Sequence, residues 1–342
     1  MLDGRKWAIL EAIVKEHILK AEPIGSRSLT RHYDFGVSSA TVRNEMADLE
    51  AMGFLEQPHT SAGRVPSDKG YRVFVDYLMQ SDELPNISKD LNKIFIHKQK
   101  QIHELIKETT QLLSQATHYI SMGVAPDFQQ TVFQHIQLIP LAGKRVVAVL
   151  VTDSGMVHNQ MFTVPKPMNR AELAQISNFL NDRLQGMTLE EISPIIMKEL
   201  EQQLVNQNIL TDVVGLIYEE ILGDIDKNLQ QIFLDGTSHI IDQPEFADLD
   251  KLKSMMSTLE QQDILYNILN QSNKDFQITI GGENSQEEMK DCSIVAATYY
   301  INGRSIGKIG ILGPTRMEYG KVIAMVQHVT KILSKLLSDG KD

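Results

Sequence analysis

Residues 38 to 53 carry polar side chains of the kinds that recognise base pairs, on what the sequence predicts to be a helix. Three apolar residues at helical spacing set its core-facing side: Val42, Met46 and Leu49. At about 3.6 residues per turn, the opposite side and its flanks hold Ala40, Thr41, Arg43 and Asn44. Arginine can pair with guanine O6 and N7, asparagine can pair with adenine N6 and N7, and a small alanine lets the backbone come close. The pattern indicates major-groove recognition, and the alternative is a solvated helix surface.

The start of this helix and the loop beyond it supply further hydrogen-bond donors. Ser38 or Ser39 is expected to cap the helix at the end where recognition helices usually meet bases. In the loop, the candidate donors to phosphate oxygens are His59, Thr60 and Ser61. Gly63 with Arg64 can place a cation on phosphate or in a minor groove. A histidine in such a loop is more often a plain surface residue.

Shorter elements around this helix complete a compact unit. An amphipathic helix is predicted over residues 3–20, and a short helix ending at residue 32 offers Arg27, Ser28 and Arg31 as clamps on the DNA backbone. A strand at residues 54–56, the loop and a final helix follow. This order predicts a winged helix-turn-helix.

Net charge by itself argues against a nucleic-acid partner, because the chain carries −11 and binding DNA requires cations to neutralise phosphates. The distribution of charge changes this interpretation. The first 80 residues hold ten Lys or Arg and eleven Asp or Glu, so nearly all of the acidic excess lies further along the chain. The N-terminal segment can therefore approach DNA.

After a linker at residues 81–86, the sequence predicts a mixed α+β fold. A long helix over residues 88–116 has a seam close to a 3.5-residue repeat, interrupted at Lys98 and Thr109. This helix either packs against its own domain or joins a dimer interface. The other predicted elements are strands over 133–140, 145–152 and 157–164, helices over 169–184, 188–207 and 209–222, strands over 232–234, 276–280, 293–300 and 305–312, and a closing helix over 322–336.

Composition and missing motifs exclude several classes of protein. The one cysteine, Cys292, excludes an internal disulfide and a cysteine-based metal cluster. No stretch reaches the roughly 18 consecutive apolar residues of a membrane span, and the start has no signal-peptide pattern, so we expect a cytoplasmic protein without a membrane partner. The motifs of serine hydrolases, P-loop proteins, zinc proteases and dinucleotide-binding enzymes are missing, so we expect no catalysis, cofactor or metal.

Four segments resemble the signature of one bacterial regulator family. They read AEPIGSR at residues 21–27, DFGVSSATVRNEM at 34–46, QPHTSAGRVP at 57–66 and IGKIGILGPTRM at 306–317. These segments are similar to those of the heat-inducible transcription repressor family, HrcA. The resemblance extends over essentially the whole chain.

This resemblance implies three parts: a winged helix-turn-helix over residues 1–80, a GAF-like domain over 88–140 and 226–338, and an inserted α+β dimerising domain over 141–225. It also implies a repressor of heat-shock chaperone operons that binds an inverted-repeat operator as a homodimer. The GroE chaperonin is implied as a partner that modulates the activity.

Two other hypotheses stay open at this stage. A GAF-like fold often encloses a small ligand, so the chain could be a metabolite-responsive regulator. The side chains available for such a pocket are His239, Asp242, Cys292 and Tyr299, although a buried structural cysteine and surface histidines are the simpler interpretation. The remaining hypothesis is a winged helix that binds protein instead of DNA.

Overall fold

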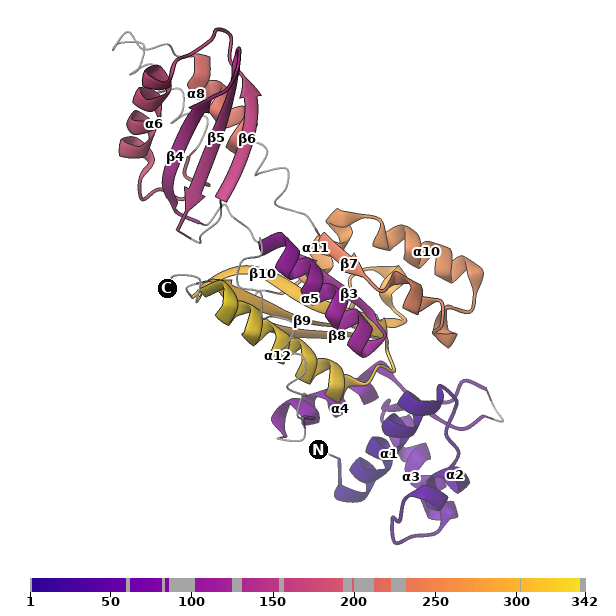
Figure 1. The fold of residues 1–342 in the computed structure, drawn as a ribbon. Helices are drawn as coiled ribbons and strands as arrows, with labels where there is room; N and C mark the ends of the chain where they lie inside the picture. Colours follow the sequence, from indigo (N-terminus) through magenta and orange to yellow (C-terminus); the bar gives the residue numbers. More distant parts are fainter. Residues whose placement is uncertain are drawn as a thin grey trace.

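The computed structural model describes residues 2–59, 62–81, 84–85, 102–124, 131–153, 157–192, 199, 212–222, 232–272, 274–301 and 303–338. The fold is α+β, with three units arranged in a row (Figure 1). We refer to residues 2–81 as the head, to 102–124 with 232–338 as the body, and to 131–222 as the outer unit. No helix among the described residues is long and apolar enough to cross a bilayer.

The head follows the predicted order of elements. It contains α1 (Gly4–Lys20), α2 (Ser26–His32), α3 (Ser39–Ala51), β1 (Leu55–Glu56), β2 (Val65–Pro66) and α4 (Asp68–Gln80), with β1 and β2 paired antiparallel. Side-chain oxygens of Asp3, Ser38 and Ser67 accept hydrogen bonds from backbone amides in the first turns of α1, α3 and α4. The apolar stripes predicted for these helices are buried.

A five-stranded antiparallel sheet forms the centre of the body, with strand order β7-β3-β10-β9-β8. Its strands are β3 (Ile120–Val124), β7 (Ile232–Asp235), β8 (Phe276–Ile280), β9 (Cys292–Ile301) and β10 (Arg304–Pro314). The helices are α5 (Ile102–Thr117), α10 (Leu249–Leu259), α11 (Gln262–Leu269) and α12 (Tyr319–Ser338), with 3₁₀ helices at Thr237–Ile240, Pro244–Phe246, Gly281–Glu283 and Glu287–Met289.

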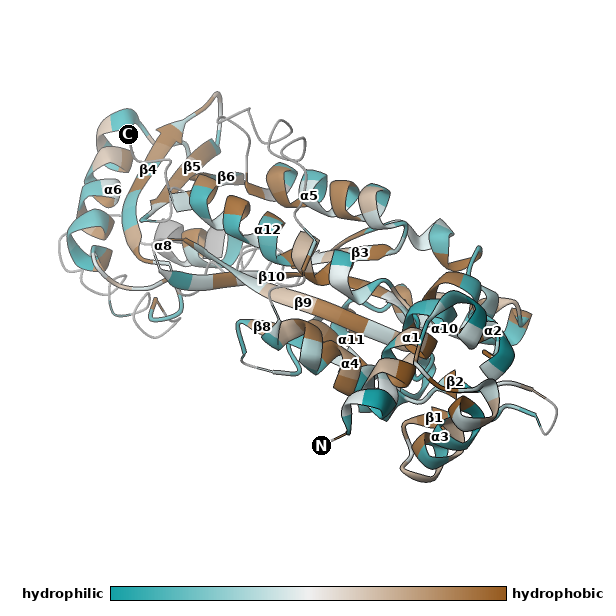
Figure 2. Ribbon diagram, turned by 90° about the horizontal axis from the view of Figure 1, so that it is seen from below, coloured by the Kyte–Doolittle hydropathy of each residue, from teal (hydrophilic) through white to brown (hydrophobic). Residues whose placement is uncertain are grey.

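The two faces of this sheet bury different apolar clusters. One face packs against α10 and α11. The other packs against α5 and α12 in a cluster that also includes side chains of α1, α3 and α4, so the head and the body share one core. In Figure 2 much of β9 is brown, while β10 mixes brown with paler segments; most residues of both strands are buried, as expected for strands covered on both faces.

Chain segments between β3 and β7 form the outer unit. It holds β4 (Phe133–Pro140), β5 (Arg145–Thr152), β6 (Val157–Thr163), α6 (Arg170–Leu184), α8 (Asp212–Ile217) and a π-helical turn at Tyr218–Leu222. The three strands make a separate antiparallel sheet in the order β4-β5-β6, and their bounds closely match the strands predicted from the sequence. The sheet and α6 enclose a core of their own.

One predicted boundary, at residue 141, falls within the sheet of the outer unit. The sequence assigned residues 133–140 to the GAF-like segment and began the insert at residue 141, whereas β4 pairs with β5 along its length. The physical reason is that Ala142 and Gly143 form a tight turn between two strands that belong together, and Gly143 has a φ of +80°. The outer unit therefore begins before β4.

Two predicted helices can be followed only in part. In the long helix expected over 88–116, the structure places α5 from residue 102 onward, packed against β3, β7 and α12 of its own body. Thr109, expected to interrupt the seam, is buried and donates its hydroxyl to the Leu105 carbonyl. Residues 88–101 and most of the helix expected over 188–207 lie outside the described residues. The described start of the second helix, residues 188–192, forms a β-bridge with Val132 and turns instead of a helix.

Candidate nucleic-acid interface

Helix α3 presents the predicted polar surface to solvent. Val42, Met46 and Leu49 are buried in the head core. On the opposite side Ala40, Arg43 and Asn44 are exposed, and Thr41 is half-buried. The side chains of Arg43 and Asn44 have no hydrogen-bond or ion-pair partner among the described residues. Both side chains are therefore available for base edges.

The capping serine is Ser38 rather than Ser39. Ser38 has extended backbone angles, and its hydroxyl accepts from the Thr41 amide at 3.2 Å and lies 3.1 Å from the Thr41 hydroxyl. Ser39 is the first residue of α3 and is half-buried. Ser38 and Thr41 therefore organise the helix start, where amide groups point outward and favour an anion such as a phosphate.

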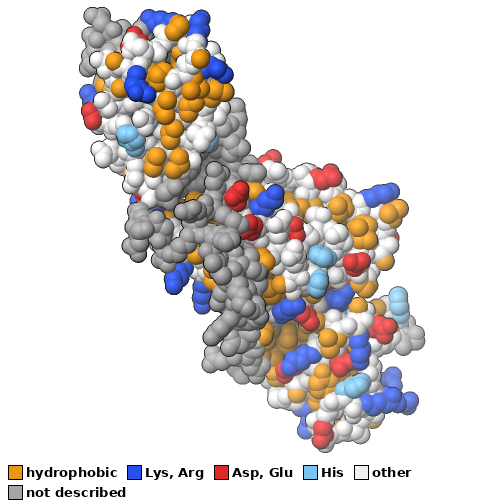
Figure 3. All heavy atoms as spheres, in the orientation of Figure 1, with side chains coloured by type: hydrophobic (Ala, Val, Ile, Leu, Met, Phe, Trp, Pro, Cys, Tyr) orange, Lys and Arg blue, Asp and Glu red, His pale blue; other side chains and the backbone are white. Residues whose placement is uncertain are grey.

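Helix α2 lies against α3 and brings two further cations near it. Only Leu29 of this helix is buried, whereas Arg27 and Arg31 are exposed and Ser28 is half-buried. The structure describes no partner for either guanidinium group. Three arginines of neighbouring helices, Arg27, Arg31 and Arg43, have no partner among the described residues and can thus meet a polyanion. The lower part of Figure 3 shows Lys and Arg side chains on the head.

The hairpin between β1 and β2 is held to the head by backbone contacts. Ile24 and Arg64 exchange two backbone hydrogen bonds of 2.9 Å each. A Cβ on Gly63 would lie 2.4 Å from the Ile24 carbonyl group, so only glycine permits this close approach. His59 is exposed at the far end of the hairpin, and the predicted donors Thr60 and Ser61 lie outside the described residues.

Arg64, predicted to place a cation on phosphate or in a minor groove, pairs with Glu50 of α3. Its Nε and Nη2 lie 2.8 Å and 2.7 Å from Oε2 of Glu50, and the Arg64 side chain is only 19% exposed. The geometry is explained by the backbone bridge to Ile24, which turns the Arg64 side chain back toward the end of α3. In this state the charge of Arg64 is used to join the hairpin to α3.

Sequence reasoning missed the acidic partners on α3. Lys6 of α1 lies 2.7 Å from Glu45 and 3.1 Å from Asp48, and these hydrogen bonds raise the pKa of Lys6 above its usual value. Arg5 adds a 3.7 Å contact with Glu45. Three acidic residues of α3, Glu45, Asp48 and Glu50, therefore pair with cations of the head, which reduces their repulsion of a phosphate backbone. The sequence did offer a signal: Glu45 and Glu50 each lie one helical turn from a buried residue of α3, so their side chains border the surface that packs on the rest of the head.

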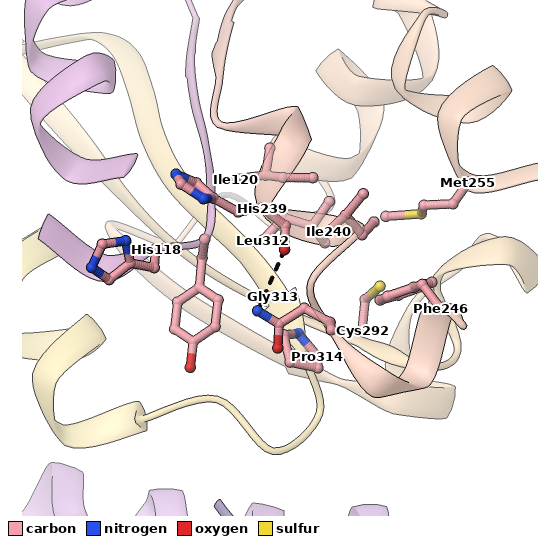
Figure 4. A pocket seen from close by; sticks show the side chains of 12 residues that line it. His118, Ile120, His239, Ile240, Phe246, Met255, Cys292, Leu312, Gly313 and Pro314 are labelled. Carbon is pink, nitrogen blue, oxygen red and sulfur yellow. Dashed lines mark hydrogen bonds between the residues drawn. The ribbon is translucent and has the colours of Figure 1, made fainter. Parts of the chain in front are cut away.

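Only two of the four residues weighed for a metabolite pocket come together. His239 and Cys292 line a cavity of about 10 Å³ beside His118 (Figure 4), a volume near the limit for one water. Tyr299 is fully buried elsewhere and donates to the Val124 carbonyl, and Asp242 is exposed. Burial raises the pKa of the Cys292 thiol, which makes it unreactive. No cluster that could hold a metal is found among the described residues.

The Glu50 and Arg64 pair yields a structural prediction. Glu50→Ala should loosen the hairpin, because Arg64 loses both of its charged contacts while its backbone bonds to Ile24 remain. Hydrogen exchange at the Ile24 and Arg64 amides should accelerate severalfold. Glu11→Ala is the matched control, since Glu11 pairs with Lys15 within α1. Equal protection of these amides in both variants would contradict this role of the ion pair.

Comparison with known proteins places these features in context. Residues 103–323 match the family model described as the HrcA protein C-terminal domain. The chain is 42% identical over 340 residues to the heat-inducible transcription repressor HrcA of Pelotomaculum thermopropionicum, covering 98% of this chain and 97% of that protein. It is 41% identical to the HrcA protein of Natranaerobius thermophilus, covering 99% and 98%.

A solved structure supports the fold as a whole. The crystal structure of a hypothetical protein at 2.2 Å resolution aligns with a TM-score of 0.71 and 20% identity, and the alignment covers 100% of both chains. Identity near 40% across almost the entire length, together with the family model, is decisive for the assignment. The chain belongs to the HrcA family of heat-inducible transcription repressors.

Proposed function

We propose that this repressor binds an inverted-repeat operator ahead of heat-shock chaperone genes as a homodimer, with the head acting as a winged helix-turn-helix. The observation that carries the proposal is the exposed Arg43 and Asn44 on α3, whose side chains have no partner among the described residues, beside Arg27 and Arg31 of α2. In this arrangement α3 enters the major groove, and α2 and the hairpin contact the phosphate backbone. A repressor of chromosomal genes would act in the cytoplasm.

In the same scheme, the contacts divide by chemistry. Arg43, Asn44 and Ala40 read base edges, with Thr41 at their flank. The residues proposed for phosphate contacts are Arg27, Ser28, Arg31, Ser38, Ser39, His59, Thr60 and Ser61. Arg64 acts through its pairing with Glu50, and contacts phosphate only if that pair opens.

Arg43 provides the sharpest test of this scheme. Arg43→Ala should reduce affinity for the operator by about 1 to 3 kcal/mol and leave affinity for a scrambled duplex nearly unchanged, because a base-edge contact is sequence-specific. The measurement is fluorescence anisotropy with an operator duplex that the full chain has selected from a random pool. Lys253→Ala, which removes an exposed charge on α10, is the control. Equal losses on both duplexes would show that Arg43 contacts phosphate and does not read bases.

We propose further that the outer unit is the dimerising domain inserted into a GAF-like body, with its first boundary between residues 124 and 133. Its sheet covers α6 with one face, and the other face carries Val147, Val149 and Val151 of β5 in a row. Flanking them, Ile139 and Met161 stand opposite Val147, and Val157 stands opposite Val151; these three are 36%, 53% and 59% exposed. Hydrophobic side chains gather over this unit in Figure 3.

A second copy of the chain is the occupant that suits this face. An inverted repeat requires a two-fold axis, and such an axis lets the same aliphatic surface pair with itself. Exposed aliphatic patches of this kind commonly mark association surfaces. Two heads joined through this face gain avidity of roughly 10² to 10⁴ on a two-half-site operator.

Met161→Glu should weaken this association at least about tenfold, because the carboxylate would be buried in an apolar interface. Leu249→Glu is the matched control, since Leu249 is 62% exposed at the start of α10 in the body. Sedimentation equilibrium measures the dimer dissociation constant of each variant. A Met161→Glu protein that dimerises like the control would place the interface elsewhere.

The family resemblance also supports modulation by the GroE chaperonin. We propose that GroE raises the fraction of molecules folded for operator binding. Stoichiometric titration of operator DNA with and without purified GroE and ATP measures this active fraction, and the fraction should rise with GroE. An unchanged active fraction would argue that the chaperonin does not act on this repressor.

A further inference from the structure

The first turn of α4 is fitted against a short 3₁₀ helix of the body. Asp68 accepts a 2.8 Å hydrogen bond from the Gly282 amide. A Cβ on Gly281, which has a φ of +53°, would lie 2.1 Å from the Asp68 carboxylate. Glycine is therefore required at a position where the body meets the head.

One turn later on the same helix, Arg72 makes a multidentate contact with the body. Its guanidinium group pairs with both carboxylate oxygens of Glu283: Nε donates to Oε1 at 2.8 Å, and Nη2 donates to Oε2. Nη2 also donates to the Ile278 carbonyl at 2.8 Å. Glu283 in turn accepts from the Ile280 amide at 2.9 Å. Arg72 thus binds the otherwise unpaired edge of β8 as well as the carboxylate.

Aromatic and polar contacts continue the junction toward α1. The rings of Tyr71 and Tyr319 lie 5.9 Å apart, and both residues are buried. His17 accepts or donates a 2.6 Å hydrogen bond with the Tyr71 hydroxyl, and burial, with Arg316 nearby, lowers the pKa of His17 to about 4, so its ring is neutral at pH 7. Arg316 pairs with Glu245 at 2.6 Å and donates to the Ile18 carbonyl at 3.4 Å.

We propose that Asp68 and Arg72 are positioning residues that lock the head to the body at Gly281–Glu283, so that the body sets the distance between the two reading helices of the dimer. The inference rests on the proposed function, because it concerns a dimer that reads two half-sites. It goes beyond that function by assigning the operator spacing to a named contact between head and body.

The location of these contacts separates positioning from reading. Figure 1 shows α4 against α12, while α2 and α3 lie on the opposite side of the head. Asp68 and Arg72 therefore do not face DNA when α3 does. A fixed head accepts one half-site spacing, whereas a head that pivots accepts several spacings and gains less avidity at each.

Arg72→Glu in the full chain tests the inference, because it places a carboxylate against Glu283. Three duplexes are compared by anisotropy: a single half-site, the selected inverted repeat, and the same repeat with about half a helical turn inserted. Lys251→Glu is the matched control, since it makes the same charge change in a pair with Asp291 inside the body. Arg72→Glu with Glu283→Arg restores opposite charges across the junction.

We expect Arg72→Glu to bind the half-site within about twofold of the unmodified chain, to lose about tenfold on the selected repeat, and to suffer less from the insertion. The double variant should recover part of the loss. Should Arg72→Glu fail to fold, Glu283→Gln removes one charge without adding repulsion and should shift the spacing dependence the same way.

Two results would overturn the inference. The first is an unchanged spacing dependence in both Arg72→Glu and Glu283→Gln. The second is an equal loss of affinity on the half-site and on the repeat, which would mean that the pair acts on the DNA-contacting surface of the head itself. Failure of the underlying function would look different. In that case the unmodified chain would select no inverted repeat, and the variants would have nothing to alter.

Discussion

The hydrophobic core that the head shares with one face of the body sheet is the constraint on which the rest of the structure depends. A head of this size closes its own apolar stripes in α1 and α3, but α4 carries Tyr71, Phe74 and Val75 into the cluster that contains Tyr319 and α12. Burial of these side chains makes separation of head and body costly. The polar contacts at the rim then select one orientation within an apolar contact that would tolerate several.

Charge is organised around the same division. The acidic residues of α3 are paired with Lys6, Arg5 and Arg64 inside the head, whereas Arg27, Arg31 and Arg43 have no described partner. A surface with unpaired cations can release counterions from DNA even though the whole chain carries −11. Most of the excess negative charge lies outside the head, where it does not meet the phosphates.

The outer unit does not take part in the core that the head and the body share. Its apolar cluster is separate from those of the body, and its sheet uses one face internally and leaves aliphatic side chains on the other. In the proposed dimer, an association surface placed away from α3 would join two copies and leave both heads free to meet DNA. Exposure of the apolar side chains of Val157 and Met161 to water is unfavourable, and burial against a second copy would remove it.

The sequence by itself determined most of the elements and the residues on the exposed side of α3. Helix caps, helical periodicity and strand patterns are local, so α3 with its exposed Arg43 and Asn44 and the strands β4, β5, β6, β9 and β10 could all be predicted. The family resemblance added the repressor function. Tertiary structure alone decided the partners of Arg64 and Arg72 and the sheet to which β4 belongs. These depend on contacts between residues far apart in the chain, such as Arg72 with Glu283, and no local pattern encodes which distant group a side chain will meet.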